Sequence, residues 1–130
     1  MLRIFAFLVF VILLPGCSTT QPERPKPNPV VFKAVRQAVR DYADSENRAI
    51  ISITANVYDG TVRTNWFPVN KGETEVKVDA SVVGERYSVE AWQRPWGIVR
   101  RPYKSARTRH AESYINKRIE RLLKQERRSH

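Results

Sequence analysis

Hydrophobic and polar positions recur along this chain with two different periods, and the changes of period predict the order of its elements. Between residues 29 and 45, apolar side chains return every three or four positions, which is the spacing of an amphipathic helix. Asn28 suits the N-cap of this helix, and Pro29 suits its first position. The apolar stripe consists of Val31, Phe32, Val35, Ala38, Val39 and Tyr42.

From residue 51 to residue 92, apolar and polar positions alternate, as in strands that bury one face. Four such runs predict four strands. The inward positions are Ile51, Ile53, Ala55 and Val57 in the first run, Val62, Thr64 and Trp66 in the second, Val76, Val78, Ala80 and Val82 in the third, and Tyr87, Val89 and Ala91 in the fourth. Glycines at 60, 72, 84 and 97 separate the runs, which is typical of an antiparallel meander. Asp59-Gly60 predicts a two-residue hairpin turn.

A second helical stripe occupies residues 108–127. Thr108 suits its N-cap, and Glu112 suits the positive end of the helix dipole. The stripe consists of Ala111, Tyr114, Ile115, Ile119, Leu122 and Leu123. The predicted fold of residues 29–130 is therefore α+β: a two-layer domain of order α-β-β-β-β-α, with an antiparallel four-stranded meander and two helices on one face.

The first 16 residues have a different pattern, in which Arg3 precedes an unbroken apolar run over residues 4–14. A transmembrane helix needs roughly 20 apolar residues, whereas a run of this length suits a secretory signal. The run ends in Leu14-Pro15-Gly16-Cys17, which resembles the lipobox of bacterial lipoproteins, although Pro15 departs from the usual Ala, Ser or Thr. A plain signal peptide with a chance Cys, or a buried apolar element with a structural Cys, would be the alternatives.

The lipobox resemblance implies both a modification and a location. Residues 1–16 would be a signal peptide that is removed before Cys17, and Cys17 would carry covalent lipid. Ser18 would favour the outer membrane, with the domain facing the periplasm, because Asp at that position is the usual signal for retention in the inner membrane. Residues 17–28 hold three Pro and no large apolar side chain, so we expect an extended tether between the lipid and the domain.

The formal net charge of +10 is concentrated in one part of the chain. Residues 17–92 hold ten bases and ten acids, whereas residues 93–130 hold twelve bases and three acids. An envelope location argues against nucleic acid and leaves an acidic envelope protein, peptidoglycan or anionic lipid as the partner. A solvated basic face without a partner is the alternative. The expected contact residues are Arg94, Trp96, Arg100, Arg101, Lys104, Arg107 and Arg109.

Catalytic chemistry finds little support in the sequence. The chain has one Cys and two His, lacks a G-x-S-x-G motif, and offers no ligand spacing for a metal. We therefore expect neither enzymatic activity nor a cofactor, apart from the lipid on Cys17. The predicted function is a membrane-anchored binding or assembly module. The alternatives are an inhibitor or immunity lipoprotein and a cell-wall enzyme. Trp66, Trp92 and Trp96 would either pack in the core or cover the sheet, or they would form an exposed aromatic platform beside the arginines.

Overall fold

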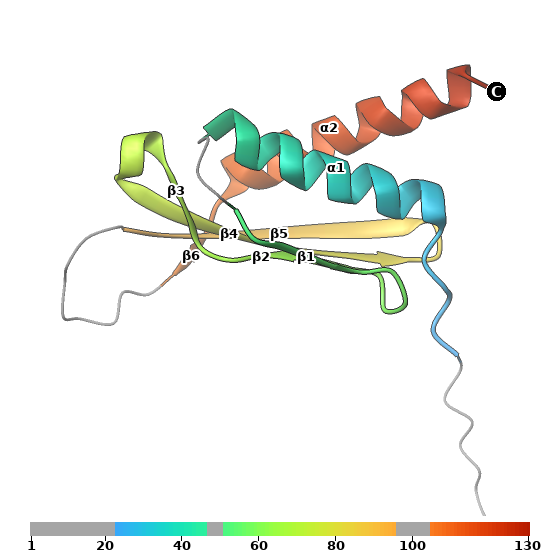
Figure 1. The fold of residues 1–130 in the computed structure, drawn as a ribbon, viewed down its shortest axis with the longest axis horizontal. Helices are drawn as coiled ribbons and strands as arrows, with labels where there is room; N and C mark the ends of the chain where they lie inside the picture. The colour runs from blue at the N-terminus through green and yellow to red at the C-terminus, as the bar shows by residue number, and fades with distance from the viewer. Residues whose placement is uncertain (1–22, 47–50, 96–104) are drawn as a thin grey trace, which may run out of the picture.

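Two helices lie side by side on one face of an antiparallel sheet (Figure 1). The computed structural model describes residues 23–46, 51–95 and 105–130. The two-layer α+β prediction is confirmed, but the predicted strand number was wrong, because the sheet has six strands. The elements are α1 (Pro29–Glu46), β1 (Ile53–Asn56), β2 (Thr61–Thr64), β3 (Phe67–Val69), a 3₁₀ turn (Asn70–Gly72), β4 (Thr74–Val83), β5 (Arg86–Pro95), β6 (Ala106–Arg107) and α2 (Arg109–Arg128).

The sheet order is β1-β2-β4-β5-β6, and β3 also pairs with β4. Strand β4 has ten residues, so β2 covers its second half and β3 its first half. The break between β2 and β3 comes at Thr64, whose hydroxyl oxygen accepts the backbone N–H of Val78. After this break the alternation of faces is shifted, so that Phe67 is buried. Trp66 lies under the guanidinium of Arg94, and its predicted inward position was wrong.

The start of α1 agrees with the sequence pattern. The side chain of Asn28 accepts hydrogen bonds from the backbone N–H groups of Val30 and Val31, as an N-cap residue should. The predicted stripe of α1 is buried against β3, β4 and β5. The sheet side of this layer consists of the buried β4 residues Val76, Val78, Ala80 and Val82. These side chains belong to one hydrophobic core, whose burial stabilises the fold by about 25 cal/mol per Å² of apolar surface removed from water.

Helix α2 buries Ala111, Ile115 and Ile119, while Leu122 and Leu123 are half-buried against the core. Thr108 holds the N-cap position, but its side chain makes no capping hydrogen bond. Instead, its backbone N–H donates to the carbonyl of Ala91 on β5. The start of α2 is therefore fixed by the edge of the sheet rather than by a capping hydroxyl.

The β1–β2 connection differs from the predicted two-residue turn. Asn56 pairs with Thr61, so the connection has the four residues 57–60. Gly60 has φ of +73°, a conformation that side chains with a Cβ rarely adopt. A Cβ at this position would lie 2.2 Å from the carbonyl oxygen of Val82 and 2.7 Å from the ring of Pro27. Only glycine therefore fits at position 60, where the β1–β2 connection, β4 and Pro27 of the segment before α1 come together.

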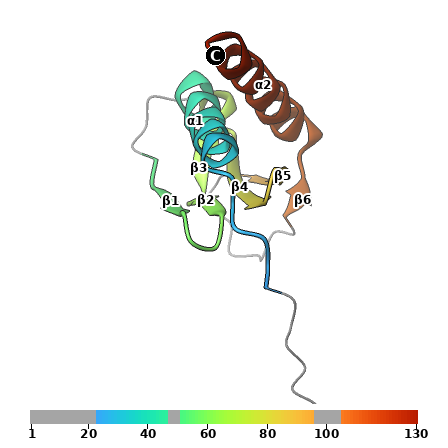
Figure 2. The same cartoon turned by 90° about the vertical axis from the view of Figure 1, so that its right-hand side faces the viewer.

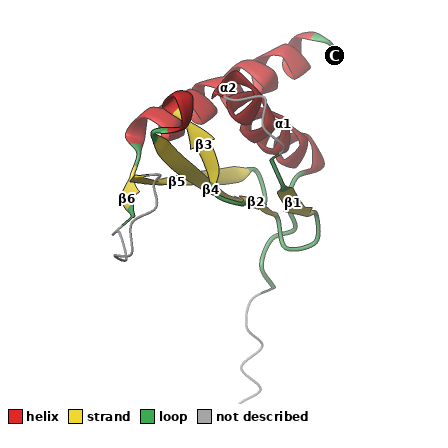
Figure 3. Ribbon diagram, turned by 60° about the vertical axis from the view of Figure 1, so that its left-hand side comes forward, coloured by secondary structure: helices red, strands yellow, loops and turns green. Residues whose placement is uncertain are grey.

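Neither of the described helices covers the other face of the sheet, which we call the open face (Figure 2). The described part of the predicted tether, residues 23–28, enters from this open side, and the β1–β2 connection projects toward the same side (Figure 3). The backbone N–H of Asn28 donates to the carbonyl of Gly84 in the β4–β5 turn. The end of the predicted tether is thus fixed to one end of the sheet, on the side opposite the helices.

Candidate docking site between the helices

The predicted contact residue Arg94 lies on β5, on the open face of the sheet. Its Nε donates to Oε2 of Glu75 at 2.7 Å. Glu75 lies directly opposite Arg94 on β4. The guanidinium carbon is 4.2 Å from the ring centre of Trp66, which is cation–π geometry. Arg94 is therefore neutralised and held in place within the domain.

Arg107 on β6 is held in the same way. It forms ion pairs with Glu112 and, at 3.6 Å, with Glu90, and its guanidinium lies 5.4 Å from the ring centre of Trp92. Glu112 also accepts the backbone N–H of Ala91. The hydrogen bond from Arg107 is the main reason that the pKa of Glu112 is lowered, and the same bond raises the pKa of Arg107. Glu112 thus joins the first turn of α2 to the edge of β5.

One further predicted contact residue, Arg109, lies within the described part of the chain. Arg109 is the first residue of α2 and is exposed. Trp96, Arg100, Arg101, Lys104 and the predicted lipidation site Cys17 lie outside the described residues. The half-exposed Trp66 and Trp92 are neither core residues nor a free platform, because an arginine covers the ring of each.

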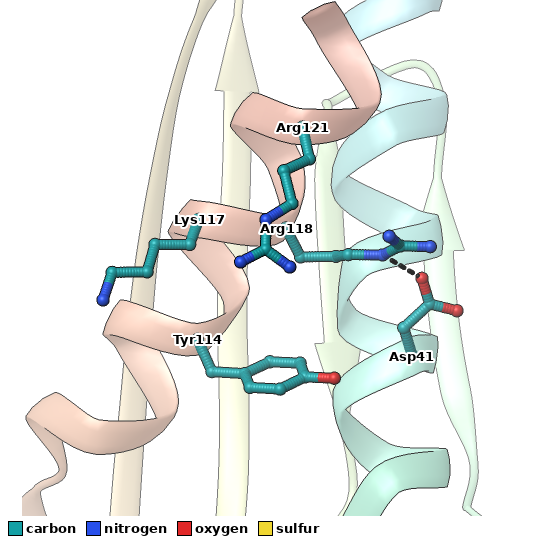
Figure 4. Close-up of a pocket in the computed structure, with 5 residues that line it drawn as sticks. All are labelled: Asp41, Tyr114, Lys117, Arg118 and Arg121. Atoms are coloured by element: carbon teal, nitrogen blue, oxygen red, sulfur yellow. Dashed lines mark hydrogen bonds and ion pairs between the residues drawn. The ribbon is translucent and has the colours of Figure 1, made fainter. Parts of the chain in front are cut away.

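A different basic cluster lies on the helix side of the domain (Figure 4). It surrounds a hollow of about 300 Å³ between α1 and α2. Most of the lining comes from α2, where spacings of three and four residues place side chains on one face of the helix. The lining residues are Asp41, Tyr114, Lys117, Arg118 and Arg121. Three cations and one carboxylate leave an excess of positive charge.

The single carboxylate of the hollow is already engaged. One oxygen of Asp41 accepts Arg118 Nε at 2.7 Å, and the other accepts the side-chain amide of Gln37 at 2.8 Å. The bond from Arg118 connects the two helices and fixes Arg118 across the hollow, and the bond from Gln37, which is also on α1, holds the carboxylate of Asp41. Among the described residues, Lys117 and Arg121 make neither an ion pair nor a side-chain hydrogen bond. Their charge is therefore available to an anion.

Tyr114 places an aromatic ring in the hollow, directed toward α1 (Figure 4). Its ring centre is 5.4 Å from that of Tyr42, which in turn lies 6.0 Å from Phe67 in an edge-to-face arrangement. Tyr42 and Phe67 are buried, whereas Tyr114 is 38% exposed. The stack connects the hollow to the core, so the ring is held in position before any partner binds.

A second hollow of about 400 Å³ follows between the first half of α1 and the last turns of α2. Its apolar lining includes Val30, Ala34, Leu122 and Leu123. Gln37 lines this second hollow and is hydrogen-bonded to Asp41 of the first, so the two adjoin along α1. Together they form what we call the interhelix groove, with one basic end and one mainly apolar end, whose lining also includes Lys33 and Glu126.

Sequence reasoning missed the basic end of this groove. The signal was present, because residues 114, 117, 118 and 121 share one helical face, yet the expectation favoured the denser arginines of residues 94–109. Guanidinium and ammonium groups beside a phenol can bind a carboxylate or a phosphate. Within the described residues, no group of three or more His, Cys, Asp or Glu is arranged to hold a metal ion.

Neither of the two described helices is long and apolar enough to cross a bilayer. No protein family, no curated protein and no solved structure matches the chain.

Proposed function

We propose that this chain is a lipid-anchored envelope lipoprotein that binds an acidic partner protein through the interhelix groove. The lipobox at Leu14-Pro15-Gly16-Cys17 supports the anchor. The observation that carries the docking role is the pair Lys117 and Arg121, which line the hollow without a carboxylate partner among the described residues. We propose binding rather than catalysis because the groove places these two cations beside an apolar surface.

The character of the groove favours a protein partner over a membrane surface or the cell wall. A phospholipid headgroup or a peptidoglycan carboxylate would use the cations alone. The adjoining apolar hollow adds Val30 and Leu122, which can bury apolar side chains of a partner peptide. A partner segment in which acidic residues are followed by apolar ones would place the acidic residues at the basic end of the groove and the apolar ones at the other end.

The charge surroundings of Arg121 support the same proposal. Its neighbours three and four positions away are Lys117, Arg118, Lys124 and Gln125, so no carboxylate of α2 shares its face. Like charges at these spacings destabilise an isolated helix by about 0.2–0.5 kcal/mol per pair. An anionic partner would relieve this repulsion on binding.

Retention of envelope proteins on the immobilised mature protein tests the docking role. At low salt we expect one acidic protein to be retained, and at high salt to be released, because exposed charge pairs are screened. The double variant Lys117→Glu/Arg121→Glu should lose this retention. The control Arg36→Glu/Arg40→Glu changes the net charge equally at exposed positions of α1 that line neither hollow. Equal losses in both variants would contradict the assignment to the groove.

Membrane fractionation tests the anchor separately. The wild-type chain should fractionate with the outer membrane, and Cys17→Ala should not be lipidated or released from its signal peptide by lipoprotein processing. A mature Cys17→Ala chain of unchanged size in the outer membrane would contradict the lipobox interpretation.

A further inference from the structure

The β1–β2 connection presents two large hydrophobic side chains to solvent. Tyr58 is 91% exposed and Val57 is 52% exposed. The other exposed large hydrophobic residues in the described part of the chain are Val30 and Tyr114, which are less exposed, at 44% and 38%, and both line the interhelix groove. Val57 and Tyr58 line none of the hollows described above, so the docking role does not account for them.

The connection is a defined turn that holds these side chains outward. The side-chain oxygen of Asn56 accepts hydrogen bonds from the backbone N–H groups of Tyr58 and Asp59. The backbone carbonyl of Asn56 accepts the N–H of Gly60. The side chain of Asp59 accepts both the backbone N–H and the hydroxyl of Thr61. These hydrogen bonds hold the backbone of the turn in one conformation. Contact of Val57 and Tyr58 with another surface would therefore cost little additional backbone entropy.

The tether reaches the domain beside this turn. A Cβ on Gly60 would contact Pro27, and the carbonyl of Gly60 accepts the N–H of Val82. From Pro27 back to Cys17 is ten residues, which span at most about 35 Å when fully extended. Figures 1 and 2 show that residues 23–28 and the β1–β2 connection project from the same side of the sheet, opposite the helices. A lipid on Cys17 would keep this end of the domain near the bilayer.

We infer that Val57 and Tyr58 form a membrane-contacting tip, with the phenol of Tyr58 at the level of the lipid headgroups. This inference rests on the proposed lipid anchor. Tyrosine is enriched at membrane–water interfaces, since its ring is apolar and its hydroxyl is polar. Two side chains bind a membrane weakly on their own, but the anchor makes their contact intramolecular and raises the effective concentration.

The tip would also set the orientation of the domain. With Tyr58 at the membrane, the open face of the sheet is directed toward the bilayer, and the helices are directed into the periplasm. The interhelix groove would then remain accessible to a partner while the protein is anchored. The described part of the tether, residues 23–28, would lie on the membrane side as well and carries Arg24 and Lys26; each cation near an anionic surface contributes about 1 kcal/mol.

Site-specific quenching in the lipidated full-length protein tests the tip. Cys17 is the only native cysteine, and its thiol would be blocked by lipid, so Tyr58→Cys provides the one free thiol for a fluorescent label. The labelled protein is reconstituted in vesicles of phosphatidylethanolamine and phosphatidylglycerol with brominated acyl chains. Matched labels at Glu73→Cys and Lys124→Cys occupy exposed positions, on the turn before β4 and on α2.

We expect the label at position 58 to be quenched several-fold more than the labels at 73 and 124. Val57→Ser in the same background should reduce that quenching, since it removes the neighbouring apolar contact. Equal quenching at all three positions in membrane-bound protein would contradict the membrane-contacting tip, but it would not contradict the lipid anchor. Failure of the protein to stay with the vesicles overturns the anchor, and the tip with it.

Discussion

The two faces of this domain use the same kind of side chain in opposite ways. On the open face of the sheet, Arg94 and Arg107 each form an ion pair with a glutamate and lie over a tryptophan ring. On the helix side, Lys117 and Arg121 line a hollow without such partners among the described residues. A count of basic residues does not distinguish the two sets, whereas the position of the carboxylates does.

The origin of this difference is the geometry of the two elements. In an antiparallel sheet, residues on neighbouring strands face each other directly, so Glu75 meets Arg94. On a helix, the neighbours are three and four positions away, and for Arg121 these are mostly further cations. The sheet arginines therefore contribute to stability, and the helix cations are available for binding.

Charge reversal on the two faces should separate these roles most strongly. The double variant Arg94→Glu/Arg107→Glu places carboxylates against Glu75, Glu90 and Glu112, and we expect a loss of roughly 3 kcal/mol in the free energy of unfolding. Lys117→Glu/Arg121→Glu should change it by less than about 0.5 kcal/mol. Urea denaturation measures both values, and similar losses would remove the distinction between the faces.

The next largest effect is expected at the junction between α2 and the sheet. Glu112 is 17% exposed at its side chain and serves both Arg107 and the N–H of Ala91. Glu112→Gln weakens both interactions, so the free energy of unfolding should fall by about 1–3 kcal/mol. Retention of the partner should be unchanged at temperatures where the variant is folded. A stability equal to that of the wild type would show that the junction contributes nothing.

The same residue predicts a dependence of stability on pH. The lowered pKa of Glu112 means that its stabilisation is present above its ordinary pKa of 4.5 and is lost as the pH falls through the folded-state pKa. The stability difference between the wild type and Glu112→Gln should therefore be largest near neutral pH and shrink in acid. Asp59, whose pKa is also lowered, contributes equally to both proteins. A difference that is constant from neutral pH to pH 3 would contradict this.

The smallest expected effects come from neutralising one arginine on each face, and they change the free energy of unfolding in opposite directions. Arg121→Gln removes the repulsion between Arg121 and its cationic neighbours, and should raise the free energy of unfolding by about 0.2–0.5 kcal/mol, the value of a single pair, because solvent screens these exposed charges. Arg94→Gln leaves Glu75 without its ion pair and should lower it by about 1 kcal/mol. Thermal unfolding of the two variants beside the wild type checks the signs. A destabilised Arg121→Gln would indicate that Arg121 has a structural role.

The sequence predicted the elements better than the pairing between them. Apolar spacing placed both helices to within one residue, and the cap at Asn28 was correct. The break between β2 and β3 was not predictable, because it depends on Thr64 bonding Val78, fourteen residues away. Strand β6 is only two residues long and has no periodicity of its own.

The groove that we propose as the site does not contain the contact residues expected from the sequence. The distribution of net charge directed attention to the C-terminal part of the chain. It did not reveal that Arg94 and Arg107 have partners on other elements, since those pairs form through sheet register and helix docking. Nor did it reveal the groove, because Asp41 and Tyr42 of α1 meet α2 only in the folded domain.

The location of anion binding tests the central claim most directly. In an amide-resolved NMR titration of the mature protein with poly-L-glutamate, the shifts should concentrate at residues 114–121 of α2 and around Asp41 of α1. They should diminish in Lys117→Glu/Arg121→Glu and persist in Arg36→Glu/Arg40→Glu. Shifts centred on Arg94 and Arg107 of the open sheet face, with α2 unaffected, would contradict the assignment of docking to the interhelix groove.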